Sequence, residues 1–190
     1  RMARLVDDLL SLSRVEANEH VRPKGQVDVA SLLAGFRASL GPRASKHDIE
    51  IELNCPDNLP LVAGDYDQLS EVFHNLLDNA LKYGPPGRPV RVNVQTVERI
   101  PETGGKGVRI CVHNMGEPIA PEHLPRLTER FYRVDKARSR DIGGTGLGLA
   151  IVKHIISRHR GRLIIESNAE TGTRFCVYLS EVRKEPPVVT

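Results

Sequence analysis

Residues 65–83 read DYDQLSEVFHNLLDNALKY, and this stretch decides the fold class. Its spacing predicts a helix over 65–82 that ends at the Gly-Pro-Pro-Gly of 84–87. The apolar face of this helix consists of Leu69, Val72, Phe73, Leu76, Leu77, Ala80 and Leu81. A polar stripe beside it consists of Glu71, Asn75, Asn79 and Lys82. By itself the stripe fits a solvated face as well as a site where amide oxygens bind Mg²⁺ and a lysine meets phosphate.

A second unusual stretch, GGTGLGLA at 143–150, opens a predicted helix over 147–159. Glycines allow positive φ angles and close backbone approach, and the N-terminus of the next helix offers N–H groups to an anion. The loop lacks the GxxxxGK[ST] pattern, and no strand runs directly into it as a Rossmann turn requires. It therefore fits either a different kind of phosphate site or a plain flexible connection.

The other segments predict an α/β fold. Strands are expected at 27–30, 49–53, 61–63, 90–97 and 108–112, with a hairpin of 163–167 and 173–179 and a helix at 31–40. Residues 114–145 form a long polar loop with only a short helical patch. We expect a two-layer sandwich, in which helices cover one face of a mixed, largely antiparallel sheet.

The first segment differs from the rest. Its apolar residues repeat as in a bundle or coiled-coil helix, so it needs a partner helix or a second copy. They are Met2, Leu5, Val6, Leu9, Leu10, Leu12 and Val15. We expect a helical segment at 1–19, a linker at 20–27 with Pro23 and Gly25, one domain at 28–181 and a disordered tail at 182–190.

The charge, the cysteines and the hydropathy of the chain exclude several classes of function. The 190 residues carry a net charge of +3 without a dense basic stripe or interleaved aromatics, so we expect no nucleic-acid partner. The three cysteines, Cys55, Cys111 and Cys176, form no metal-type cluster, and we expect buried, reduced thiols in a reducing cytosol. No stretch is long and apolar enough to span a bilayer, and we take the chain to be a piece of a longer protein.

The order of the motifs resembles the histidine-kinase catalytic domain of the Bergerat-type (GHKL) ATPase superfamily. The matching segments are NLLDNALKY at 75–83 (the N box), NMGEPI at 114–119 (the first glycine box), ERFYR at 129–133 (the F box of a nucleotide lid), GTGLGL at 144–149 (the second glycine box) and Gly172-Thr173. The resemblance covers residues 28–180 and implies an ATP site between the N-box helix and a mobile lid.

The resemblance also implies roles. Asn79 would bind Mg²⁺ with help from Asn75, and Lys82 and Tyr83 would approach the phosphates. Arg130 and Arg133 would steady the phosphate tail, and the loop backbone would wrap it through Gly144, Gly146, Leu147 and Gly148. Thr173 would lie near the adenine edge, and the remaining nucleotide contacts would come from Asn114, Gly116, Ile119, Phe131 and Thr145.

The chemistry implied is phosphoryl transfer rather than hydrolysis. In ATP-hydrolysing relatives a Glu lies four residues before the metal-binding Asn, where this chain has Asn75, which is no general base near neutral pH. Glu71, one turn earlier, could polarise a nucleophile, so the expected catalytic set is Glu71, Asn75 and Lys82.

Two positions depart from the family pattern D-x-G-x-G. Asn114 stands where an Asp accepts a hydrogen bond from the adenine amino group, and Pro118 stands where a Gly is usual. An amide oxygen still accepts the bond but lacks the charge, a loss of about 1 kcal/mol, or about fivefold in affinity. Either this variant keeps its ATP binding, or the nucleotide site is weakened.

The acceptor histidine is expected elsewhere, because none of the seven histidines is followed by the kinase pattern His-Glu/Asp-Leu-x-x-Pro. By the resemblance, 1–19 is part of the second helix of a dimerisation domain. The phosphoryl group would go to a histidine of that domain and then to a response-regulator receiver, in a homodimer anchored in a bacterial inner membrane with this part in the cytoplasm. Residues 127–140 look similar to the phosphate-sensing subgroup.

Two alternatives remain. A degenerate, kinase-like adaptor would keep the fold and dock partners without productive ATP binding, and Asn114 and Pro118 slightly favour it. A Ser/Thr kinase of the anti-sigma type shares the fold but lacks an N-terminal bundle helix.

Overall fold

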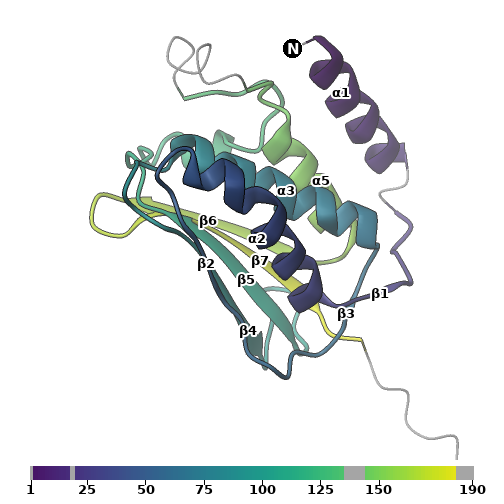
Figure 1. The fold of residues 1–190 in the computed structure, drawn as a ribbon. Helices are drawn as coiled ribbons and strands as arrows, with labels where there is room; N and C mark the ends of the chain where they lie inside the picture. The colour runs from purple at the N-terminus through teal and green to yellow at the C-terminus, as the bar shows by residue number, and fades with distance from the viewer. Residues whose placement is uncertain (1, 18–19, 135–143, 183–190) are drawn as a thin grey trace, which may run out of the picture.

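Five strands form the main sheet of the computed structural model, which describes residues 2–17, 20–134 and 144–182 (Figure 1). They are β2 (Ile51–Asn54), β4 (Val90–Val97), β5 (Gly107–Asn114), β6 (Arg162–Asn168) and β7 (Gly172–Ser180). Their order is β2-β4-β5-β7-β6, and only β2 and β4 pair in parallel. A parallel pair needs a crossover, which helix α3 (Tyr66–Tyr83) supplies. The mixed, largely antiparallel sheet confirms the predicted fold class.

Helices α2 (Val29–Ser45), α3 and α5 (Gly148–Arg158) cover one face of this sheet (Figure 1). Valines of β4 that alternate with polar residues, such as Val92, are buried beneath them. Phe73 of α3 and Ile151 of α5 are fully buried in the same core. The predicted apolar face of α3 and the predicted helix α5 therefore meet the predicted strands, with α5 packed alongside α3.

Local capping sets where α3 and α2 begin. The Asp65 carboxylate accepts a hydrogen bond of 2.9 Å from the Gln68 N–H, as an N-cap does. Asp28 caps α2 in the same way through Ser31, so the predicted strand at 27–30 is wrong beyond Val27. That strand, β1 (Gln26–Val27), pairs with β3 (Val62–Ala63), which joins the end of the predicted linker to the domain predicted at 28–181.

Helix α2 is longer than the 31–40 predicted from its periodicity. It continues through Pro42 to Ser45, although proline removes one backbone hydrogen bond. Leu40 and Ala44, one turn apart, are both buried against the core and hold this last turn in place. The added turn carries Arg43 towards α3.

The end of α5 is anchored by a buried histidine. His159 accepts a hydrogen bond from the Asp65 N–H at Nε2 (3.0 Å), and its Nδ1 lies 2.7 Å from the Ile155 carbonyl oxygen. Burial lowers the pKa of this imidazole. The neutral ring fits both contacts, accepting at one nitrogen and donating at the other, and so ties α5 to the cap of α3.

The face of the sheet opposite the helices carries a row of charged side chains across the strands. The row runs Glu52, Arg91, His113, Arg174 and Glu166. Ion pairs join Arg91 to Glu52 at 2.8 Å and Arg174 to Glu166 at 3.2 Å. No described helix covers this face (Figure 1).

A disulfide joins Cys111 of β5 to Cys176 of β7. The expectation of reduced thiols is therefore wrong for these two residues and right for Cys55, which keeps a free thiol. The cysteines are 65 residues apart in sequence but directly opposite in register. Spacing along the chain could not reveal this, because it depends on β5 and β7 being neighbours.

Helix α1 (Met2–Ala17) lies against α5 on the outside of the helix layer (Figure 1). Leu12 and Val15 are buried there, while Met2, Val6 and Leu10 are exposed along the rest of the apolar seam. Among the helices of the described residues, none is long and apolar enough to cross a membrane. The predicted disordered tail lies outside the described residues, apart from Val182.

Candidate nucleotide-binding site

The N-box helix meets the second glycine box at the first residue of α5. A Cβ atom built on Gly148 would lie only 3.0 Å from Oδ1 of Asn75. A side chain there would force this amide to shift by a few tenths of an ångström, so glycine leaves room for Asn75 beside the helix N-terminus. The polar stripe predicted on α3 and the predicted phosphate loop are therefore in contact.

The start of α5 is built like an anion site. Its N-cap position, Leu147, makes no side-chain cap to the first turn, which leaves N–H groups without the usual side-chain acceptor. Such groups are the donors that a phosphate takes at a helix N-terminus. The Thr145 hydroxyl accepts a hydrogen bond of 3.3 Å from the Leu147 N–H and stiffens the loop before the helix.

The F box packs backbone to backbone against this loop. The Phe131 N–H donates a hydrogen bond of 2.9 Å to the Gly146 carbonyl. A Cβ on Gly146 would lie 2.9 Å from the Phe131 Cα, and the φ of Gly146 is 76°. Both the close contact and the positive φ therefore require glycine at this position. Arg133 reaches the same loop, with its guanidinium beside Gly144.

Tyr132 anchors the chain before the glycine loop. His123 Nδ1 lies 2.6 Å from the Tyr132 hydroxyl, next to the short 3₁₀ helix η1 (Leu124–Arg126). The Arg126 guanidinium lies 4.2 Å from the centre of the tyrosine ring. Residues 135–143, which belong to the predicted lid and include Gly143, lie outside the described residues.

The adenine end predicted from the sequence lies where β5 ends and β7 begins. Asn114 and Thr173 are opposite each other in register, and each is only 3% exposed. The Thr173 hydroxyl lies 2.7 Å from the Ser167 hydroxyl, which accepts a hydrogen bond of 2.9 Å from the Ile119 N–H. Sequence reasoning missed Ser167, although strand alternation would put it on the same face as Thr173.

Gly116 brings the first glycine box against the end of α3. A Cβ at this position would collide with the Tyr83 carbonyl oxygen. The residues predicted to contact adenine and phosphate thus approach each other around the C-terminal end of α3. The side chain of Tyr83 is exposed there.

Lys82, predicted to approach the phosphates, is paired with Asp78. Its Nζ lies 2.5 Å from one carboxylate oxygen, and Arg43 Nη1 of α2 lies 2.7 Å from the other. Burial alone would raise the pKa of Asp78, but hydrogen bonds from Lys82 and then Arg43 outweigh it and lower that pKa. Sequence reasoning missed Asp78 and Arg43, since their contact depends on the last turn of α2.

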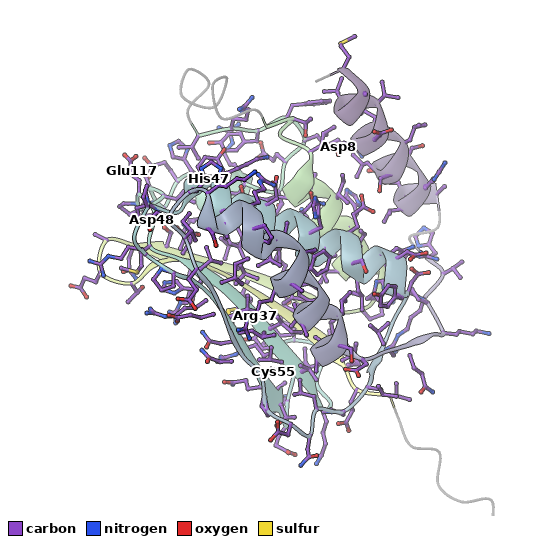
Figure 2. All side chains as sticks on the ribbon, in the orientation of Figure 1. Asp8, Arg37, His47, Asp48, Cys55 and Glu117 are labelled. Atoms are coloured by element: carbon purple, nitrogen blue, oxygen red, sulfur yellow. A yellow bond between two sulfur atoms is a disulfide. The ribbon has the colours of Figure 1, made fainter. Side chains whose placement is uncertain are left out.

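Helix α1 contacts both predicted phosphate-binding elements through carboxylates. The Thr145 hydroxyl donates a hydrogen bond of 2.6 Å to Asp8, which lies on α1 (Figure 2). Arg130 of the F box forms an ion pair with Glu16, which also lies 3.3 Å from His154. In this arrangement Arg130 is held by α1 rather than directed at a phosphate.

Glu71, predicted to polarise a nucleophile, is turned towards α1. Its carboxylate accepts a hydrogen bond of 2.6 Å from the Ser11 hydroxyl. A cavity of about 380 Å³ lies beside it between α1 and the start of α3. Another, of about 570 Å³, lies between α2 and β2. Neither of these two cavities is lined by residues of the glycine boxes.

The described residues contain no group of three or more His, Cys, Asp or Glu side chains that could hold a metal. Asn79, half-buried on the stripe of α3 one turn after Asn75, offers a single amide oxygen. That fits a Mg²⁺ ion that takes most of its ligands from phosphates and water.

Residues 64–183 match the family model of histidine kinase-, DNA gyrase B- and HSP90-like ATPases. The chain belongs to this family. The resemblance to a histidine-kinase ATP-binding domain is thereby confirmed. The match to this ATPase family begins just before α3, so α1, β1 and α2 lie outside it.

Relatives of this ATPase-family chain include sensor histidine kinases. It is 41% identical to sensor histidine kinase CusS of Escherichia coli O157:H7, over 95% of this chain and 36% of CusS. It is 38% identical to the phosphate regulon sensor protein PhoR of Pseudomonas aeruginosa PAO1, over 95% of this chain and 39% of PhoR. These similar identities do not single out the phosphate-sensing subgroup. The chain spans little more than a third of either relative.

The fold is similar to a solved kinase structure as well. The crystal structure of full-length ShkA in complex with AMPPNP superposes with a TM-score of 0.79 at 26% identity. The superposition covers 96% of this chain and 37% of ShkA. Because it covers 96% of this chain, the likeness extends beyond the region of the family match.

Proposed function

We propose that this chain is the ATP-binding catalytic part of a sensor histidine kinase. It transfers the γ-phosphoryl group of ATP to a histidine on a dimerisation helix, from which the group passes to a response-regulator receiver domain. The observation that carries this proposal is the contact between Asn75 and the first residue of α5 at Gly148. It joins the predicted metal-binding stripe to the predicted phosphate loop.

Each part of the site has a role in this proposal. Asn79, assisted by Asn75, holds the Mg²⁺ ion, which when bound neutralises charge on the phosphates. The N–H groups at the start of α5 bind the phosphate oxygens. The end of β5 and the start of β7 pair with each other and hold the adenine through Asn114 and Thr173. AMPPNP, with which ShkA was solved, is an ATP analogue and supports this choice of ligand.

Transfer to a protein side chain fits the site better than hydrolysis. Asn75 occupies the position of the hydrolytic Glu in related ATPases and offers no base for water. Glu71 faces Ser11 of α1, the helix assigned to dimerisation, rather than the start of α5. Its role as an activator of the nucleophile therefore stays a prediction that depends on where the acceptor histidine docks.

The partners follow from α1. Its exposed apolar residues, including Met2, Val6 and Leu10, need a covering helix, which a homodimeric bundle provides. None of the seven histidines has the acceptor pattern, so the acceptor belongs to another part of the bundle. We place this part on the cytoplasmic side of a protein anchored in the bacterial inner membrane, with a receiver domain as its partner.

A kinase-like adaptor is the second candidate, and Asn114 is the observation that favours it. This side chain is buried at the predicted adenine position and is neutral where the family has a charged acceptor. A domain that had lost ATP could retain the same fold for docking. Binding of a nucleotide separates the two candidates.

The test is calorimetric titration of the chain with MgATP, together with Asn79→Ala and the control Asn93→Ala. Asn93 lies in β4 on the opposite face and pairs with Asn54 at 2.9 Å. We expect saturable binding, a loss of tenfold or more for Asn79→Ala, and no change for the control. A chain that folds but binds no MgATP would support the adaptor. Phosphate transfer to a full-length kinase that has its acceptor histidine but a disabled ATP site tests the second half of the proposal.

A further inference from the structure

Asp78 of the N box is a nearly buried carboxylate with two cationic partners. Its side chain is 14% exposed and that of Lys82 is 16% exposed. Lys82 comes from the same helix, one turn on, whereas Arg43 comes from α2. Each cation contacts a different oxygen of the carboxylate. Removal of one partner therefore leaves the other in place.

This arrangement matters for the proposed function, on which the inference rests. In the proposed function Lys82 contacts the phosphates, whereas in the structure its ammonium forms an ion pair with Asp78. If Lys82 turned to a triphosphate and no other cation remained, a nearly buried carboxylate would lose its charge partner. That is among the costly changes in a protein interior. The affinity for the triphosphate would fall by the same amount.

We infer that Arg43 is a positioning residue for the nucleotide site, because it keeps Asp78 paired while Lys82 exchanges the carboxylate for a phosphate. A guanidinium suits this role, since it stays charged at all relevant pH values and binds carboxylates with directed N–H groups. Arg43 is 41% exposed and does not itself lie on the polar stripe of α3. It acts through Asp78 and not by touching the nucleotide.

The position of Arg43 depends on features outside the region matched by the family model. It stands on the last turn of α2, which continues past Pro42 because Leu40 and Ala44 are buried. The Phe36 ring of α2 packs on the His74 ring of α3, with 6.2 Å between centroids. The buried last turn and this ring contact thus place α2 so that the guanidinium reaches Asp78.

The experiment measures the binding of MgATP and of adenosine to the 190-residue chain and its variants. Arg43→Ala is expected to weaken MgATP roughly five- to tenfold, the loss of about one charge-assisted contact, and to leave adenosine unchanged. Arg43→Lys, which keeps the charge, is expected to restore most of the affinity. The matched control is Arg91→Ala, because Arg91 has the same charge, is 44% exposed and pairs with Glu52 on the opposite face.

A double variant tests the exchange itself. With Asp78→Asn no carboxylate needs a second cation, so Asp78→Asn/Arg43→Ala should bind MgATP as tightly as Asp78→Asn alone. A further loss in the double variant would overturn the inference. So would an equal loss of adenosine and MgATP affinity in Arg43→Ala, since that pattern indicates a general structural role.

Lys82→Ala distinguishes failure of the inference from failure of the proposed function. If Lys82→Ala weakens MgATP and Arg43→Ala does not, only the role of Arg43 is wrong. If Lys82→Ala leaves MgATP binding unchanged, the phosphate role of Lys82 is wrong, and the inference falls with it.

Discussion

The two ends of the candidate nucleotide site are built differently. At the adenine end, Asn114 and Thr173 are buried, neutral and held by the pairing of β5 with β7 and by Ser167. At the phosphate end, three side chains predicted to contact the nucleotide are already bound to carboxylates. Thr145 pairs with Asp8, Arg130 with Glu16 and Lys82 with Asp78.

Under the proposed function, this difference means that the adenine end is already arranged for its ligand while the phosphate end must change partners. Hydrogen bonds within a sheet position adenine contacts before any ligand arrives, so little ordering remains to be done on binding. A triphosphate must instead displace carboxylates, which are themselves anions and bind the same donors. We therefore expect changes at the adenine end to alter stability and base recognition, and changes at the phosphate end to alter triphosphate affinity.

The largest expected effect comes from the disulfide between the two adenine-end strands. A bond that closes a loop with a sequence separation of 65 residues stabilises a fold by about 4 kcal/mol in the chain-entropy model. Reduction should lower the free energy of unfolding, measured in urea with and without dithiothreitol, by about this amount. Cys55→Ser is the control and should respond to reductant as the parent chain does. Equal stability in both conditions would argue against the bond.

The anchor of α5 should give the next largest effect. His159→Ala removes the acceptor of the Asp65 N–H and leaves a cavity, at a cost of about 2 kcal/mol. Above the ordinary histidine pKa of 6.5 the parent chain keeps its full stability. As the pH falls below 6.5 the unfolded chain takes up a proton that the folded chain resists, because burial lowers the pKa of His159 in the fold.

Urea unfolding at several pH values measures this effect. The stability of the parent chain should decrease between pH 6.5 and the lower pKa of the folded state, relative to His159→Gln, which has no imidazole to titrate. The same decrease in both proteins would mean that other groups cause it.

At the adenine end, Asn114→Asp should strengthen MgATP binding about fivefold, or by about 1 kcal/mol. A carboxylate accepts the hydrogen bond of the adenine amino group more strongly than an amide does. The comparison of adenosine with a nucleoside lacking that amino group, such as inosine, isolates the contact. Unchanged discrimination between the two would show that Asn114 does not contact the base.

At the phosphate end, Asp8→Asn should strengthen MgATP binding about threefold, since it removes an anion that competes for Thr145. The effect is small because the carboxylate is only partly buried and screened by salt. Asp7→Asn makes the same change of charge one residue earlier and should have a smaller effect. If adenosine gains as much as MgATP, the competition is not with phosphate, and the contrast between the two ends is lost.

Much of the molecule could be predicted because its signals are local. The apolar face of α3, the alternation in β4 and the two-strand hairpin of β6 and β7 all appear within single segments. Gly146 and Gly148 can be predicted for the same reason, since a backbone that must approach another chain segment closely requires glycine, which is visible in the sequence. Their partners, Phe131 and Asn75, both belong to motifs that the sequence had already picked out.

Contacts between residues far apart in the sequence could not be predicted. The disulfide requires Cys111 and Cys176 to be opposite in neighbouring strands, and the end of α2 requires burial of Leu40 and Ala44 to outweigh Pro42. Local propensity says nothing of either, because each depends on packing against a distant segment.

Sequence alone therefore determined most of the helices and strands and the α/β sandwich that they build. It also determined that the Asn and Lys stripe and the glycine loop are motifs of one ATPase family. Tertiary structure alone decided which charged and polar groups pair. Arg43 and Lys82 both contact Asp78, and carboxylates of α1 bind Thr145 and Arg130. Periodicity is a property of one segment and can be read along the chain. An ion pair between helices depends on where packing of the core brings two distant surfaces together.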